Sequence, residues 1–188
     1  EQNEKFKDIA INGGFELLNS SELKNYLDMS SIKIIGVTGT NGKTTTASTI
    51  YKILLNLGYK VALQGTRGFF INELCVEDYS LTTPVQLGNF INIQKAIQNS
   101  CQYFVMEVSS HAIEQNRIEG LDFALKIHTN ITRDHLDYHK TIEEYIRVKN
   151  LFLSDESKKL INIDDKVVKF NPINAFTYSL ENSSNFKV

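Results

Sequence analysis

Short apolar runs alternate with segments of helical periodicity along most of the chain. Residues 32–37 form a largely apolar run that is typical of a buried strand. Residues 44–57 follow with apolar side chains at helical spacing, and Gly58 supplies a stop signal. By the same criteria we predict further strands at residues 59–63, 69–71, 74–76, 103–108, 125–130, 160–163 and 175–178. The runs at 69–71 and 74–76 are expected to pair as a small hairpin.

Two capping boxes indicate where further helices begin. Thr83 is followed by Pro84 and then by Gln86, which predicts a helix that starts there and extends to about residue 98. Thr141, with Glu144 three residues later, predicts a helix to about residue 153. The alternation of strands and helices predicts an α/β fold, a mainly parallel sheet flanked by helices. Ligands of such sheets bind beyond the carboxyl ends of the strands, so functional residues are expected just after strands.

A glycine-rich segment, residues 36–45, joins the first predicted strand to the first predicted helix. Glycines let successive backbone N–H groups turn towards phosphate oxygens, and a helix N-terminus favours the same anion. Lys43 is placed to reach the terminal phosphates, and the Thr44 hydroxyl to ligate Mg²⁺. The strict phosphate-loop spacing fails, because Val37 stands where its first glycine belongs. The alternative is a plain turn with a solvated lysine, but the glycine density at this junction favours nucleotide binding.

Polar residues also follow two later strands. Glu107 stands near the end of the run at 103–108, where a carboxylate can face a Mg²⁺ held by the glycine-rich loop. A solvated acid at a strand end is the alternative. Residues 130–139 combine two aspartates with two histidines, so they either line a ligand or cap the next helix. His135 is a candidate metal ligand, although Mg²⁺ usually prefers oxygen.

Lys149 stands inside an apolar stripe. The helix that begins near Thr141 carries at helical spacing Ile142, Tyr145, Ile146, Lys149, Phe152 and Leu153. The pattern alone favours snorkelling, in which the long stem lies on the core and the ammonium reaches water. If the ammonium is instead buried, it needs a partner or altered chemistry, because an unpaired buried charge is expensive.

Composition narrows the choice of partners. The formal net charge of −2 gives no global basic field for nucleic acid, so a polyanionic ligand needs a local site. No apolar run approaches the ~20 residues of a membrane helix, and the first residues lack the apolar segment of a signal peptide. Cys75 and Cys101 lie in unrelated contexts without metal spacing. We therefore expect a cytoplasmic, monomeric protein without nucleic-acid or membrane partners.

Five motifs, taken in order, resemble the Mur ligase family of ATP-dependent amide-forming ligases. They are TGTNGKTT at 38–45, TTP at 82–84, MEVSSHA at 106–112, QNR at 115–117 and TNITRDHLDYH at 129–139. The resemblance spans about residues 32–152 and looks closest to the branch that adds the third residue of the muramyl peptide. Lys140 departs from the pattern, because relatives usually have glycine at that position.

The resemblance implies a role for individual residues. The nucleotide would be bound by Gly39, Thr40, Asn41, Gly42, Lys43, Thr44, Thr45 and Asn130. Thr44 and Glu107 would bind one Mg²⁺, and Glu107 with His135 a second. Lys149 matches the family lysine that reacts with CO₂ to form a carbamate, an anion able to support the magnesium site. Lys43, Glu107, His135 and Lys149 would thus form the catalytic set. The muramyl-peptide substrate would contact Thr82, Thr83, Ser109, Gln115 and Arg117.

The implied activity is amide formation in peptidoglycan precursor synthesis. The γ-phosphoryl group of ATP would pass to the D-glutamate side-chain carboxylate of UDP-MurNAc-L-Ala-D-Glu. The amine of a diamino acid would attack the acyl phosphate; family frequency favours meso-diaminopimelate over L-lysine. One alternative is a folylpolyglutamate synthase-like ligase, which would share the ATP site of this family but not the contacts to the sugar-peptide substrate. A second alternative is a P-loop regulatory NTPase, which would hydrolyse nucleotide without forming an amide bond. It would leave Lys149, Gln115 and Arg117 unexplained.

The family resemblance also predicts the domain organisation. Residues 1–30 are expected to be a remnant of an N-terminal UDP-binding domain with its linker. Residues 31–188 are expected to form a central ATP-binding domain, incomplete at its C-terminus, without the C-terminal amino-acid-binding domain. Such a fragment is expected to lack ligase activity on its own.

Overall fold

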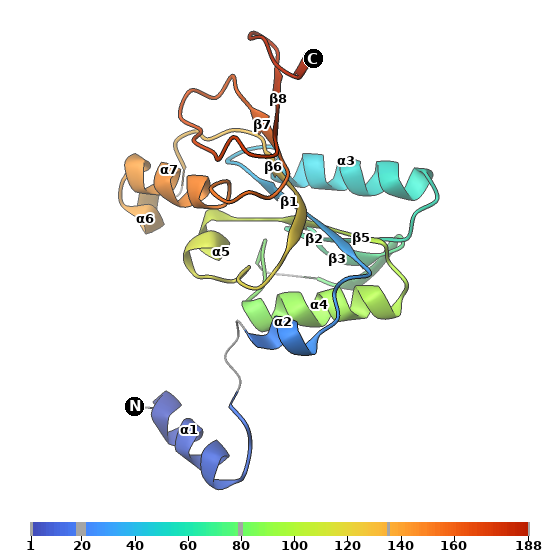
Figure 1. Cartoon of the computed structure of the whole chain (residues 1–188), viewed down its shortest axis with the longest axis vertical. Helices are drawn as coiled ribbons and strands as arrows, with labels where there is room; N and C mark the ends of the chain where they lie inside the picture. The colour runs from blue at the N-terminus through green and yellow to red at the C-terminus, as the bar shows by residue number, and fades with distance from the viewer. Residues whose placement is uncertain (1, 18–21, 79–80, 135, 188) are drawn as a thin grey trace.

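The computed structural model describes residues 2–17, 22–78, 81–134 and 136–187. Within these ranges the strands form one sheet in the order β4-β3-β2-β5-β1-β6-β7-β8-β9 (Figure 1). In chain order the strands are β1 Lys33–Thr38, β2 Val61–Gly65, β3 Gly68–Ile71, β4 Leu74–Glu77, β5 Tyr103–Glu107, β6 Phe123–His128, β7 Lys159–Asn162, β8 Ala175–Ser179 and β9 Phe186–Lys187.

The sheet is parallel except at one edge. β5 and β6 flank β1, so that Ile35 pairs with Val105 on one side and with Leu125 on the other. β2 continues the parallel arrangement beyond β5, whereas β3 and β4 add an antiparallel hairpin. β1 is buried over all but its first residue, as expected of a strand covered on both faces. The predicted α/β fold and the predicted hairpin are confirmed.

Helices cover both faces of this sheet. The helices of the described residues are α1 Gln2–Asn12, α2 Leu23–Tyr26, α3 Lys43–Asn56, α4 Gln86–Gln98, α5 Ser110–Glu114, α6 Leu136–His139 and α7 Ile142–Leu151. Successive strand residues point to opposite faces, so Ile34 and Ile35 enter different cores. Ile35 belongs to the core that includes Ala47 of α3, and Ile34 to the core that includes Phe90 of α4 and Val148 of α7. In Figure 1, α1 lies away from the sheet.

Two helix predictions need correction. α4 begins at Gln86 rather than at Pro84, because the Thr83 hydroxyl donates to the carbonyl oxygen of Glu107 instead of capping the helix. In α3 the predicted apolar stripe is only partly buried: Ile50 and Leu54 pack against the core that contains the fully buried Ala47, whereas Ile53 and Leu57 are exposed. The short side chain of Ala47 lets the helix approach the sheet closely. In both cases a tertiary contact overrides a local pattern.

The predicted start of α7 is confirmed. Thr141 is the residue before the helix, and its hydroxyl oxygen accepts a hydrogen bond from the backbone N–H of Glu144 at 3.2 Å. Lys140, just before it, has a φ of 65°, in the left-handed region that favours glycine. Lys140 therefore adopts this turn at a cost in backbone strain.

Candidate active site

The glycine-rich loop leaves β1 at Thr38 and enters α3 at Lys43. Gly42, which precedes the helix, has a φ of 83°. Gly39 has a φ of 150°, and a Cβ at this position would lie 1.8 Å from Thr129 Oγ1. Only glycine therefore allows the loop to lie against the segment that follows β6.

Asn130, in that segment, holds the loop. Its Oδ1 accepts from the backbone N–H of Asn41 and its Nδ2 donates to the Asn41 carbonyl oxygen, both at 3.0 Å. Its own carbonyl oxygen accepts from the backbone N–H of Thr40 at 2.7 Å. Asn130 thus contacts the loop backbone directly, which fixes the loop's shape. Thr45 is exposed in the first turn of α3.

Lys43 folds back over the loop. Its Nζ donates to the carbonyl oxygens of Gly39 and Thr40, both at 2.9 Å. Burial lowers the pKa of Lys43 below its ordinary value, and the negative charges of Glu107 and Asp134 oppose that shift. The ammonium is therefore held at the loop, under the influence of two carboxylates.

Glu107 ends β5 and is 2% exposed, which excludes the solvated alternative. Its Oε2 accepts from Thr44 Oγ1 at 2.8 Å, and its Oε1 accepts from the backbone N–H of Thr66 at 2.9 Å. Gly65 makes room for the carboxylate, because a Cβ there would lie 2.1 Å from Glu107 Oε1. Thr66 was not among the predicted site residues, although it follows a strand as such residues were expected to do.

Lys149 is 1% exposed, so the snorkelling alternative is wrong. Its Nζ donates to the Gly39 carbonyl oxygen at 2.8 Å and lies 5.1 Å from the centre of the Tyr145 ring. The Tyr145 hydroxyl is in turn 2.9 Å from Thr40 Oγ1, so α7 contacts the loop through two side chains. Burial, reinforced by the nearby charge of Lys43, lowers the pKa of Lys149 to about 7.

The residues predicted to contact a substrate lie together beside Glu107. Thr83 Oγ1 donates to the Glu107 carbonyl oxygen at 2.8 Å and accepts from the backbone N–H of Ser109 at 3.1 Å. Arg117 Nη1 donates to the Thr83 carbonyl oxygen at 2.8 Å, and its Nη2 donates to Gln115 Oε1 at 2.6 Å. Four of the five predicted substrate residues thus form one hydrogen-bonded cluster, hereafter the threonine–arginine cluster (Thr83, Ser109, Gln115, Arg117).

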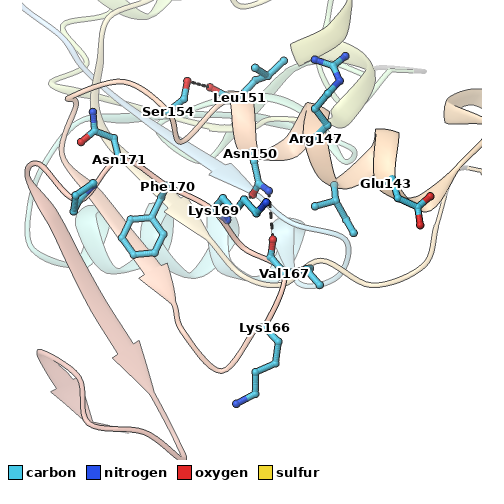
Figure 2. A pocket seen from close by; sticks show the side chains of 12 residues that line it. Glu143, Arg147, Asn150, Leu151, Ser154, Lys166, Val167, Lys169, Phe170 and Asn171 are labelled. Carbon is cyan, nitrogen blue, oxygen red and sulfur yellow. Dashed lines mark hydrogen bonds between the residues drawn. The ribbon is translucent and has the colours of Figure 1, made fainter.

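A pocket of about 270 Å³ joins this cluster to the loop. It is lined by Lys43, Leu81, Thr82, Thr83, Ser109, Ser110, His111, Arg117, Tyr145 and Lys149. Both lysines of the predicted catalytic set therefore face the same cavity as most predicted substrate residues. A larger hollow of about 980 Å³ lies across α7, between Arg147 and Lys166 (Figure 2), and its lining contains no predicted site residue.

The side chains of Thr44 and Glu107 suit Mg²⁺. A hydroxyl and a carboxylate that approach to 2.8 Å are hard oxygen donors, the kind that Mg²⁺ prefers. The predicted further ligand, His135, lies outside the described residues. Within the part of the chain that the structure describes, no three His, Cys, Asp or Glu side chains are grouped to hold a metal ion. Most ligands of an ion here would be phosphate and water oxygens, as is usual for Mg²⁺.

Comparison with known proteins places this loop and pocket in a known family. Residues 37–188 match the model of the Mur ligase middle domain. The chain belongs to the Mur ligase family. The resemblance drawn from five short motifs is thereby confirmed. Within this Mur ligase chain, no helix of the described ranges is long and apolar enough to cross a membrane.

Curated relatives of this Mur ligase chain include two UDP-N-acetylmuramoyl-L-alanyl-D-glutamate–2,6-diaminopimelate ligases. The protein of Helicobacter pylori (strain J99) is 53% identical over 186 residues, which cover 99% of this chain and 41% of that protein. The protein of Wolinella succinogenes is 57% identical over 171 residues, 91% of this chain and 39% of that protein. The chain thus spans about two fifths of the length of these relatives.

Solved structures agree with the fold. A structure of UDP-N-acetylmuramoyl-L-alanyl-D-glutamate–2,6-diaminopimelate ligase matches with a TM-score of 0.77 and 31% identity, over 89% of this chain and 37% of that one. A folylpolyglutamate synthase/dihydrofolate synthase from Yersinia pestis, complexed with AMPPNP and Mn ion, matches with a TM-score of 0.62 and 18% identity. The match covers 85% of this chain and 46% of that one. The second likeness shows the fold alone.

Proposed function

We propose that this chain forms the ATP-binding part of a Mur ligase that adds a diamino acid, with meso-diaminopimelate favoured, to UDP-MurNAc-L-Ala-D-Glu. The names of its relatives support that substrate and that amino acid. One structural observation carries the proposal. Lys43, the Thr44–Glu107 pair and Lys149 converge on one glycine-rich loop, beside a pocket that the threonine–arginine cluster also lines.

The loop would hold the phosphates of ATP. Its backbone N–H groups and the start of α3 offer hydrogen-bond donors and a positive dipole end to an anion. Lys43 would exchange its two carbonyl partners for terminal phosphate oxygens and so offset the charge that builds up during phosphoryl transfer. Thr44 and Glu107 would hold Mg²⁺, which supplies further charge neutralisation at the transferred group when bound.

Lys149 is suited to forming a carbamate. Only a neutral amine attacks CO₂: a carbon–nitrogen bond forms, and the nitrogen releases a proton to water. An ordinary lysine, with a pKa of about 10.4, is almost entirely protonated near neutral pH. The pKa of Lys149, lowered to about 7, leaves a large share of this amine neutral there. The product would convert a buried cation into an anion beside the magnesium site, which explains a lysine on an inward face.

The threonine–arginine cluster would bind the muramyl peptide. The Arg117 guanidinium already makes three hydrogen bonds, one to Thr83 and two to Gln115, so it is oriented before any ligand arrives and keeps one further N–H each on Nη1 and Nη2. A guanidinium held in this way can grip a carboxylate or phosphate through two parallel hydrogen bonds. It would present the peptide carboxylate to the γ-phosphate, and the resulting acyl phosphate would then react with the incoming amine.

Calorimetric titration of the chain with ATP and Mg²⁺ tests the nucleotide site. We expect magnesium-dependent binding that Lys43→Ala weakens at least about tenfold, because charge-assisted hydrogen bonds to phosphate are lost. Lys52→Ala is the matched control, since Lys52 lies on the same helix but is exposed and pairs with Glu73. Absence of ATP binding by the unmodified chain would refute the proposal.

The substrate is tested separately, in the full-length form of the protein that contains the chain. We expect it to form an amide with UDP-MurNAc-L-Ala-D-Glu and not with a folate substrate. Reaction with folate instead would assign the protein to the folylpolyglutamate synthase branch. ATP hydrolysis without amide formation would favour a regulatory NTPase.

A further inference from the structure

Ser110 and His139 form a buried contact at the wall of the pocket. Ser110 is 2% exposed and His139 is 3% exposed. Ser110 Oγ and His139 Nε2 lie 2.9 Å apart, within hydrogen-bond distance. Ser110 begins α5 and lines the pocket, whereas His139 ends α6. The contact therefore joins the pocket wall to a helix that lies behind it.

The tautomer of His139 decides the direction of this hydrogen bond, and Glu114 lies on the side that favours one tautomer. Its Oε2 lies 3.5 Å from His139 Nδ1, longer than an ordinary hydrogen bond but close enough for electrostatic attraction. A carboxylate on that side favours the tautomer with its proton on Nδ1, which leaves Nε2 as the acceptor. The Ser110 hydroxyl then donates to Nε2. Its oxygen keeps its lone pairs for a second partner, so Ser110 acts towards the pocket as an acceptor.

Aromatic neighbours hold the imidazole in place. The His139 ring centre lies 4.9 Å from that of Tyr138, 5.3 Å from that of Tyr145 and 5.6 Å from that of His111. The Tyr138 hydroxyl in turn accepts a hydrogen bond from Gln115 Nε2 at 2.8 Å. A side chain restrained on several sides orients its hydrogen-bond partner at little further entropic cost on binding.

We propose that Ser110 is a further substrate-contacting residue of the pocket, with His139 and Glu114 as its positioning residues. This inference rests on the proposed function, because it assigns the pocket to the muramyl peptide. A free hydroxyl can both donate and accept, but Ser110 has its donor committed to His139 and can only accept. Its partner must therefore be a donor. The peptide part of the substrate offers amide N–H groups, and Arg117 is the group suited to its carboxylate.

Steady-state kinetics of the full-length form that contains the chain test this role. We expect Ser110→Ala and His139→Ala to raise the KM for UDP-MurNAc-L-Ala-D-Glu about tenfold, the effect of losing one buried hydrogen bond. The KM for ATP should stay near that of the unmodified protein in both variants. His139→Gln should restore part of the affinity, because its amide oxygen can accept from Ser110. Glu114→Gln should have an intermediate effect.

Ser154→Ala is the matched control. Ser154 follows the end of α7 on the wall of the larger hollow (Figure 2), and its hydroxyl donates to the Leu151 carbonyl oxygen at 2.8 Å. The same chemical change there should leave the KM for the muramyl dipeptide unaltered.

Two results would overturn the inference while leaving the proposed function intact. One is an unchanged KM for the muramyl dipeptide in Ser110→Ala. The other is an equal rise in both KM values together with a lower melting temperature, which would show that Ser110 and His139 only stabilise the fold. Failure of the unmodified full-length protein to form the amide would refute both the proposed function and this inference.

Discussion

Two of the buried lysines lie at opposite ends of the sheet's strands, and they have different surroundings. At the amino end of β7, the Nζ of the fully buried Lys159 donates to the carbonyl oxygens of Asp155 at 2.8 Å, Ser157 at 2.7 Å and Ile173 at 3.0 Å. At the carboxyl edge of the sheet, Lys149 is equally buried. Among the described residues its Nζ donates to one acceptor, the carbonyl oxygen of Gly39.

The difference separates a structural lysine from one available for chemistry. An ammonium has three N–H donors, and Lys159 uses all of them. Burial lowers the pKa of Lys159, as does the nearby charge of Lys126, whereas the carboxylates of Asp155 and Glu156 oppose the shift. Lys149 likewise lies near a second cation, Lys43, with Asp134 opposing the shift, and its pKa is lowered to about 7. Three carbonyl acceptors stabilise the ammonium form of a buried lysine, whereas a single acceptor stabilises it less.

The largest expected effect is on catalysis. In the full-length form that contains the chain, Lys149→Ala should lower the rate of amide formation by at least about a hundredfold, because a charged group near the transferred phosphoryl group is lost. Added small carboxylic acids should restore part of the rate by supplying the missing anion. The measurement is turnover with and without acetate. An undiminished rate in this variant would eliminate the carbamate role, and Lys159→Arg serves as the control at the other end of the sheet.

The second effect is on stability, and here the larger loss is expected at Lys159 and not at Lys149. Lys159→Ala should lower the free energy of unfolding by about 2–4 kcal/mol, because it leaves buried carbonyl oxygens without donors. Lys149→Met should lower it little or raise it, since one hydrogen bond is lost while the cost of burying a charge disappears. Urea denaturation of the two variants measures both values. If Lys149→Met were the more destabilising change, the distinction between the two lysines would be wrong.

Much of this arrangement was predictable from periodicity and from the family motifs. The predicted strand at 103–108 put Glu107 near the carboxyl edge of a parallel sheet, where functional residues are expected, and the helical spacing of α7 put Lys149 on the inward face. The glycine density of the loop indicated its tight path, which Gly39 makes possible beside Thr129. These features depend on residues that are near one another in sequence, or on a topology that such patterns determine.

Contacts between distant segments were not predictable in the same way. Thr66 reaches Glu107 because β2 pairs with β5, and no local pattern specifies that pairing. The contact of Ser110 with His139 joins residues far apart in the chain, and both have ordinary helical surroundings. Thr83 matched a capping box but bonds to the neighbouring strand instead. In each case the tertiary partner, absent from the local sequence, decides the outcome.

The smallest expected effect concerns pH and tests the surroundings of Lys149 directly. In the unfolded chain its pKa is about 10.4, whereas in the folded chain it is about 7. Between these values the unfolded state binds the extra proton, so the free energy of unfolding rises with pH across this window. For one pH unit above about 7 the gain should be about 1 kcal/mol, below the ceiling of about 1.4 kcal/mol per unit. Lys149→Met lacks this gain. Both proteins are denatured in CO₂-free buffer at several pH values, and the unfolding free energy of the variant is subtracted from that of the unmodified chain. The subtraction removes the contributions of Lys43 and Lys159. A difference that stayed constant with pH would mean that Lys149 remains charged in the folded chain, as its counterpart at the amino end of β7 is expected to do.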